Sequence, residues 1–265
     1  MDKLLQNPAI QAGVAPFVAA LIVAVLLMRT RFLGLAQLVG FVVVVALTIG
    51  FSFESLTSTR KLVLAGLFTL VPILLLEFGN CSMSPVARSA IALWAGLAGV
   101  WAILRVLQQK ETASALLAGV ASALYLAALV DATLRVSSDS LRASASGLML
   151  GLASGALAWL GASALLAQVG IAIGAAAGAT LLVQMLAGKR APTGASISLP
   201  ASVVAGLVGV LAVFTGTLPW YCLLPTLAIP WASRMVAAGS RPVWQTAFLT
   251  AFAALIPLLL ALGLA

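Results

Sequence analysis

Histidine is absent from this 265-residue chain, and charged residues make up only 8% of it. Without histidine, the sequence lacks the usual haem ligand, the commonest zinc ligand and the usual general base of a serine hydrolase. The two cysteines, Cys81 and Cys222, stand far apart and form no CxxC motif, so they indicate neither a metal site nor a redox site. We therefore expect no cofactor and no bound metal.

Apolar residues are abundant instead. They make up 63% of the chain, and the mean hydropathy is +1.20. A soluble domain contains about 45–50% apolar and about 25% charged residues. A water-soluble fold of this length could not hide so much apolar surface, because roughly half of a globular surface must face water. The composition predicts an all-α integral membrane protein.

The basic residues fit the same class of protein. The net charge is +8, but the 14 lysines and arginines stand in ones and twos between apolar runs. Nucleic-acid binding requires basic residues that cluster on one face, whereas scattered pairs are typical of the flanks of membrane helices. The bilayer is thus an expected partner, and nucleic acid is not.

Ten apolar segments are long enough to span a bilayer, which takes about 20 residues as a helix. A bend near "WLGAS" (159–163) divides the long run between Ser144 and Leu186, and nine to eleven helices are allowed. The first segment is too long for a signal peptide and ends in "RTR", so we expect a retained helix. The expected segments are about 10–28, 32–51, 61–79, 88–107, 113–134, 143–161, 165–187, 199–216, 218–236 and 243–263.

The connections are too short for a soluble domain, so residues 1–265 are predicted to form one membrane domain. Ten helices give two groups of five, 1–135 and 143–265, on either side of a charged linker. Halves with an odd number of helices would form an inverted repeat, as in many transporters, although no sequence similarity relates them. Nine basic residues against five favour a topology with both termini on the non-cytoplasmic side, in what we expect to be a bacterial inner membrane.

Two acidic residues fall inside predicted membrane helices, where ionisable groups are costly and indicate function by default. Asp131 lies one turn before Arg135, so a structural ion pair competes with a proton or cation site. Glu77 has no such neighbour and precedes Asn80, which makes it the candidate proton carrier. No acidic residue occurs from Ser140 onwards.

The segment 218–236 has an unusual proline content. Proline removes a backbone donor and kinks a helix, which frees carbonyl groups, and broken helices form substrate sites in transporters. A kinked packing helix is the alternative. The candidate residues are Pro219, Pro225 and Pro230 at the breaks, with Tyr221 and Thr226 as polar contacts.

Two stretches carry a glycine at every fourth position, in GxxxG repeats that place the glycines on one helix face. In lipid, such faces allow close helix packing. We expect the two helices to pack tightly on each other or on a third; a homodimer face and a gating hinge are the alternatives. The glycines are Gly147, Gly151 and Gly155 in the first stretch and Gly170, Gly174 and Gly178 in the second.

These features favour a compact permease or exporter for a neutral or weakly polar solute, with protons as the simplest coupling ion. The alternative is a non-catalytic membrane subunit that assembles with a larger complex or with copies of itself. The chain resembles the drug/metabolite transporters in helix count alone. An enzyme is not expected, since the aspartate-rich motifs of intramembrane prenyltransferases and the histidine of rhomboid-like proteases are both missing. A polar-lined cavity beside Glu77 or segment 218–236 would indicate a transporter.

Overall fold

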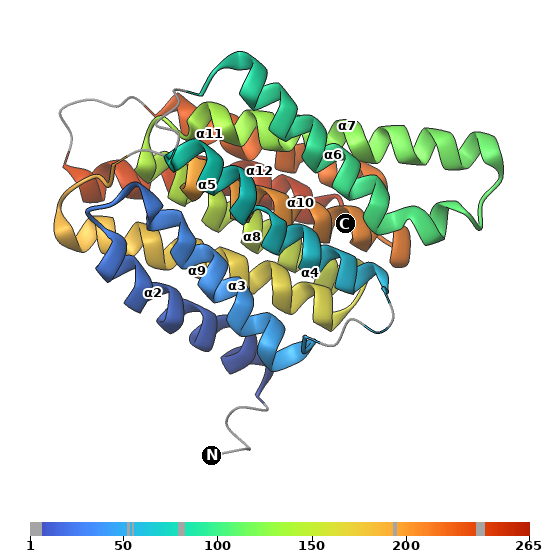
Figure 1. Cartoon of the computed structure of the whole chain (residues 1–265), viewed down its shortest axis with the longest axis horizontal. Coiled ribbons are helices and arrows are strands. Elements are labelled where there is room, and N and C mark those ends of the chain that lie inside the picture. Colours follow the sequence, from blue (N-terminus) through green and yellow to red (C-terminus); the bar gives the residue numbers. More distant parts are fainter. Residues whose placement is uncertain (1–6, 52–53, 55, 79–82, 193–194, 237–241) are drawn as a thin grey trace.

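The computed structural model describes residues 7–51, 54, 56–78, 83–192, 195–236 and 242–265. The chain is 86% helical, and the described residues contain no strand. Its helices pack side by side in a bundle (Figure 1). The prediction of an all-α polytopic bundle is confirmed.

Within the described residues, nine helical stretches are long and apolar enough to cross a membrane. Two contain short irregular turns, η1 (Ile10–Val14) before α2 (Ala15–Leu27) and η2 (Arg31–Gly34) before α3 (Leu35–Thr48). A third is divided into α4 (Ser58–Phe68) and α5 (Leu70–Phe78). The other six are α6 (Pro85–Leu107), α7 (Thr112–Val136), α8 (Ser140–Gly161), α9 (Ala164–Ala187), α10 (Ala195–Thr215) and α12 (Val243–Gly263).

The expected segment 218–236 is not one continuous helix. It forms the 3₁₀ helix η3 (Trp220–Leu227) and the short helix α11 (Ala228–Met235). It nevertheless crosses the bundle: Thr217 N donates to Gly161 O at the end of α8, while Arg142 Nη2, at the start of α8, donates to Val236 O. The part of the chain that the structure describes therefore crosses the bundle ten times, nine times as apolar helices and once as a broken segment.

The division between α4 and α5 has a simple cause. Pro72 has no backbone N–H and cannot bond to Phe68 O four residues earlier, so the helix is interrupted at Thr69. The Thr69 hydroxyl satisfies Gly66 O at 2.6 Å. Pro257 has no such effect, because α12 continues through it.

Helix α10 lies at the centre of the bundle. Every residue from Ala195 to Ala212 is buried, as expected for a helix that is apolar on all sides. It contacts α6, α7, α8 and α9, while the α2–α3 pair packs on α9. The first and second halves of the sequence are therefore interleaved in space, and their relation as an inverted repeat stays a prediction.

The two glycine stretches meet between α8 and α9. A Cβ atom built on Gly151 would lie 2.3 Å from Gly174 N, and one on Gly170 would lie 2.5 Å from Gly155 N. These backbones touch, so no side chain fits between them. The remaining two glycines contact side chains instead: Gly147 faces Ala201 and Ala177, and Gly178 faces Leu148.

A similar close approach fixes α3 to α10. Pro200 cannot donate to Ser196 O, which leaves that carbonyl without its helical partner. Gly34 packs directly against it, since a Cβ on Gly34 would overlap the carbonyl oxygen. The Ser196 hydroxyl also donates to Arg31 O at 2.6 Å, so the start of α3 is held at the start of α10.

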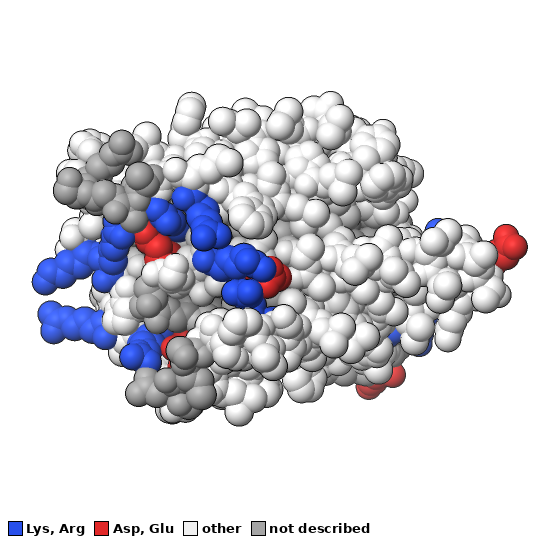
Figure 2. Space-filling model, turned by 90° about the horizontal axis from the view of Figure 1, so that it is seen from above, with Lys and Arg blue, Asp and Glu red and all other residues white. Residues whose placement is uncertain are grey.

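The charged residues separate into two ends of the bundle. One end, here called the basic end, carries most of them, as Figure 2 shows. It comprises the loops after α2 and α7, the described residues that follow α9, the end of α11 and the start of α6. The opposite end carries Arg60, Lys61, Arg105 and Lys110. This division matches the one expected from the sequence, although Arg241 and Lys3 lie outside the described residues.

Candidate functional site

The broken crossing η3–α11 holds a buried pair of hydroxyl groups. Tyr125 Oη on α7 lies 2.8 Å from Thr226 Oγ1, and Thr226 Oγ1 donates to Leu223 O at 2.6 Å. Since a threonine hydroxyl has one proton, Tyr125 donates to Thr226. The lone pairs of the Tyr125 oxygen remain available as acceptors.

A pocket of about 370 Å³ lies beside this pair, between α7, α10 and η3. Its wall is mostly apolar, with Val210, Phe214 and Leu223 among its residues, so it is not the polar-lined cavity expected of a transporter from the sequence. Leu124, Trp220 and Leu224 at its rim are exposed, so the pocket opens toward the lipid-facing surface. Non-helical backbone is tolerated at membrane depth only where it is buried in protein or lines a cavity. Here Thr226 bonds to a carbonyl of η3, and the pocket lies beside η3.

Ser122 adds a second polar atom to the pocket wall. It lies one turn from Tyr125 on α7, and its hydroxyl donates to Ala118 O at 2.7 Å. Both hydroxyl protons are thus used within the protein, and both oxygens can accept. The pocket is therefore lined by apolar side chains and by two residues with hydroxyl groups, Ser122 and Tyr125.

The inner side of the hydroxyl pair is closed. There Tyr125 and Thr226 pack against Leu150, Leu157 and Gly209, and no volume is left for a water molecule. The pocket is consequently connected to the lipid side only, and a solute would have to displace Tyr125 or η3 to enter the bundle.

The candidate residues of segment 218–236 differ in burial and in position. Thr226 is buried in the site, whereas Tyr221 is 43% exposed and stacks edge-on against Trp220. Pro219 caps the start of η3, Pro225 lies within it, and Pro230 lies in the first turn of α11. Sequence reasoning did not find Tyr125, because nothing in the spacing of α7 indicates that it faces a helix one hundred residues later.

Glu77 lies apart from this pocket, at the basic end. Its Oε1 accepts a hydrogen bond from Ser196 N at 3.2 Å, at the N-terminus of α10. The first N–H groups of a helix have no intrahelical partner, so this carboxylate satisfies one of them across 119 residues of sequence. Asn80, the expected neighbour of Glu77, lies outside the described residues.

Asp131 is held by two arginines at the same end. Arg88 Nε and Arg135 Nε each lie 2.7 Å from one of its carboxylate oxygens. The second pair is the i,i+4 pair expected from the sequence; the first joins α6 to α7. Both oxygens are occupied, so the geometry favours the ion pair over a cation site.

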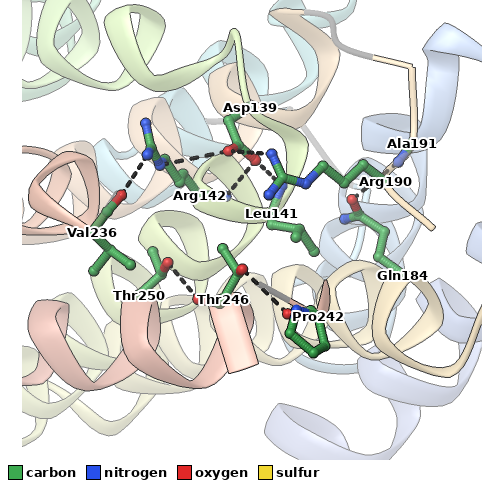
Figure 3. Close-up of polar contacts among 10 residues, drawn as sticks. All are labelled: Asp139, Leu141, Arg142, Gln184, Arg190, Ala191, Val236, Pro242, Thr246 and Thr250. Atoms are coloured by element: carbon green, nitrogen blue, oxygen red, sulfur yellow. Dashed lines mark hydrogen bonds and ion pairs between the residues drawn. The ribbon is translucent and has the colours of Figure 1, made fainter. Parts of the chain in front are cut away.

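A second ion-pair cluster surrounds Asp139, which caps α8 (Figure 3). Its Oδ1 accepts from Leu141 N at 3.1 Å, and its Oδ2 lies 3.1 Å from Arg190 Nη1 and 3.5 Å from Arg142 Nε. The carboxylate is 8% exposed. This cluster joins the loop before α8 to the loop after α9, and it fixes their relative position.

Buried amides and hydroxyls continue from this cluster into the bundle. Gln184 Nε2 donates to Ser144 Oγ at 3.0 Å, and Gln184 Oε1 accepts from Ala191 N at 3.2 Å (Figure 3 shows the second contact). Thr180 Oγ1 lies 3.1 Å from the same serine. These bonds join α8 to α9 beside the glycine contact. Gln37 of α3 is fully buried near Gly147, and neither of its amide atoms has a partner among the described residues.

No protein-family model, curated protein or solved structure matches this chain. The fold alone defines its class: the chain is a multi-pass, all-α integral membrane protein. Among the cavities found, the pocket that touches the broken crossing combines an irregular segment with unused hydrogen-bond acceptors, and we take it as the candidate site.

Proposed function

We propose that this chain is a permease or exporter for a neutral, amphipathic small molecule, which binds at the pocket between α7, α10 and η3. The observation that carries the proposal is the broken crossing with the Tyr125–Thr226 pair at its break. Transporters build substrate sites from interrupted helices of this kind. The pocket opens to the bilayer, so the solute would enter from lipid.

The chemistry of the pocket narrows the solute class. Its apolar wall favours ring or chain hydrocarbon, and the Tyr125 and Ser122 oxygens accept one or two hydrogen bonds. No lysine, arginine or acid lines the pocket. An amine, amide or hydroxyl on an otherwise apolar molecule meets these conditions, and a strongly charged solute does not.

The experiment measures efflux of N-phenyl-1-naphthylamine, a neutral apolar fluorophore with one N–H donor, from preloaded bacterial cells that lack their main exporters. Expression of the chain should speed the decay of fluorescence. Tyr125→Phe removes the accepting oxygen and should slow efflux about tenfold, the loss expected for one hydrogen bond of about 1.4 kcal/mol. Tyr221→Phe removes an exposed hydroxyl from the same crossing and is the matched control.

The outcomes separate cleanly. Faster efflux with the wild type and with Tyr221→Phe, but not with Tyr125→Phe, supports the proposal. Efflux equal to that of cells without the protein, or equal in all three variants, would overturn it, provided that each variant reaches the membrane at wild-type level.

One observation favours the alternative, a scaffolding membrane subunit. The α6–α7 pair extends beyond the rest of the bundle at the opposite end (Figure 1), and its exposed residues include Leu116, Leu117 and Val120. A partner helix could pack on this extension. If efflux is absent and a stoichiometric partner that copurifies with the wild type is lost with Leu117→Asn, the scaffold replaces the permease.

A further inference from the structure

Two cationic side chains at the opposite end of the bundle have no acidic partner among the residues that the structure describes. Lys61 of α4 is 5% exposed, and its Nζ donates to Trp101 O at 2.8 Å and lies 5.4 Å from the centre of the Trp101 ring. Arg105 follows Trp101 by one turn on α6, so it lies next to the residue that Lys61 contacts. Neither forms an ion pair with a described residue.

The contacts of Lys61 leave most of its hydrogen-bonding capacity unused. An ammonium group has three donors, and the described residues accept from one of them. A buried charge requires a partner, because its transfer out of water is otherwise unfavourable. The carbonyl and the ring of Trp101 compensate in part, and Arg105 adds a like charge. The pair thus forms a site with affinity for an anion.

An apolar groove begins directly beside these cations. Its first part, of about 250 Å³, lies between α4 and α6 and is lined by Phe68, Trp94 and Trp101 among others. A second part of about 310 Å³, between α5 and α6, shares Phe68 and Trp94 with the first and continues to Ala90. The groove therefore runs along α6 from Trp101 to Ala90, about 16 Å at 1.5 Å per residue. The α4–α5 break lies beside Phe68, where the two parts join.

We propose that this groove is a binding site for an anionic phospholipid. The phosphate would bind Lys61 and Arg105, and an acyl chain would lie along Phe68 and Trp94. Basic pockets between membrane helices bind anionic head groups in other membrane proteins. A partner helix fits the groove less well, because helix–helix interfaces in lipid use small residues, whereas this surface presents Leu97 and Phe68. The site is separate from the pocket at Tyr125 and does not depend on the proposed transport.

The test measures the melting temperature of the purified full-length chain in a neutral detergent, with dioleoylphosphatidylglycerol or dioleoylphosphatidylcholine added in equal amounts. Phosphatidylglycerol should raise the melting temperature by about 5 °C more than phosphatidylcholine, since a ligand that binds only the folded state stabilises it. Glycerol 3-phosphate at the same concentration should have no effect, because it lacks the acyl chain.

Variants assign the effect to the groove. Arg105→Gln changes an exposed side chain and should remove at least half of the difference between the two lipids; Lys61→Met with Arg105→Gln should remove all of it. Ala98→Phe should fill the groove and also abolish the difference. Lys110, at the same end, and Ala253, on α12, line neither part of the groove. The control variants Lys110→Gln and Ala253→Phe should therefore retain the difference between the two lipids.

Three results would overturn the proposal. Equal stabilisation by both lipids would show that the charge is not recognised, and full stabilisation by glycerol 3-phosphate would show that the groove is not needed. Retention of the difference in Arg105→Gln and in Ala98→Phe would place the lipid elsewhere. If Lys61→Met does not fold, Arg105→Gln and Ala98→Phe still test the proposal.

Discussion

At the scale of single residues, the carboxylates of this chain serve mainly to join helices. Glu77 bonds to the first turn of α10, Asp131 joins α6 to α7, and Asp139 links the loops around α8 and α9. All three lie at the basic end, where arginines are numerous. A chain with six acidic residues thus uses half of them as ties between its helix ends.

Glu77 gives the sharpest prediction at this scale. Glu77→Ala removes the acceptor of Ser196 N at the buried start of α10 and should lower the free energy of unfolding by about 0.5–2 kcal/mol, the range of a lost helix cap. Glu77→Gln keeps an acceptor oxygen and should lose only a few tenths of a kcal/mol. Thermal denaturation in detergent measures both. Loss of efflux in Glu77→Gln at an unchanged melting temperature would instead favour the proton carrier expected from the sequence.

Single residues of the candidate site were only partly accessible to sequence reasoning. The prolines of segment 218–236 made Thr226 a candidate, because a proline frees carbonyl groups that a nearby hydroxyl can satisfy. Tyr125 could not be found in this way, since its role depends on the packing of α7 against η3. The contact of Lys61 with Trp101 and the burial of Gln37 likewise follow from tertiary packing and leave no local pattern.

At the scale of helices, the glycine stretches bring α8 and α9 into direct backbone contact. Their backbones touch at Gly151 and Gly174 and at Gly155 and Gly170. Van der Waals contact of this kind replaces the hydrophobic effect, which does not act between helices in lipid. The hydroxyl–amide bonds of Ser144, Thr180 and Gln184 then fix the register of the two helices.

Gly151 is therefore expected to tolerate no side chain. Gly151→Ala would place a methyl group 2.3 Å from Gly174 N, and the overpacking should cost about 1–3 kcal/mol. Gly178→Ala is the control on the same interface, because its nearest neighbour is the flexible end of Leu148 at 3.3 Å. Unfolding in mild denaturing detergent measures both variants, and equal stability of the two would show that the glycine faces do not hold the helices together.

Helix positions were predictable because apolar length is a strong local signal in a membrane protein. The expected division at "WLGAS" agrees with the end of α8 at Gly161 and the start of α9 at Ala164. The break at Thr69 and the 3₁₀ geometry of η3 were less accessible. Proline marks where a backbone bond is lost, but it does not by itself show whether the helix is interrupted, as before Pro72, or continues, as at Pro257.

At the scale of the whole molecule, ten crossings place the start of α2 and the end of α12 at the same end, away from the basic end. The greater number of arginines at the basic end favours its cytoplasmic location, and we propose this orientation. The packing also explains why the relation between the two halves was hard to predict from the sequence, because α2 and α3 pack mainly on α9 of the second half.

Cysteine labelling tests the orientation. In a chain with Cys81→Ser and Cys222→Ala, Glu111→Cys in the α6–α7 turn should react in intact cells with a membrane-impermeant maleimide. Lys189→Cys, exposed after α9, should react only after the cells are opened. Labelling in the reverse pattern would invert the topology, and labelling of both from outside would contradict a ten-crossing arrangement.

The lengths of the crossings have a consequence for the surrounding bilayer. The first crossing, Ile10–Leu27, has 18 residues and the fifth, Thr112–Val136, has 25, which correspond to about 27 Å and about 38 Å of helix. Hydrocarbon thickness adapts to such differences at a fraction of a kcal/mol per ångström. The two flanks of the molecule thus match membranes of unequal thickness, and the protein should collect short-chain lipids beside α2 and long-chain lipids beside α7.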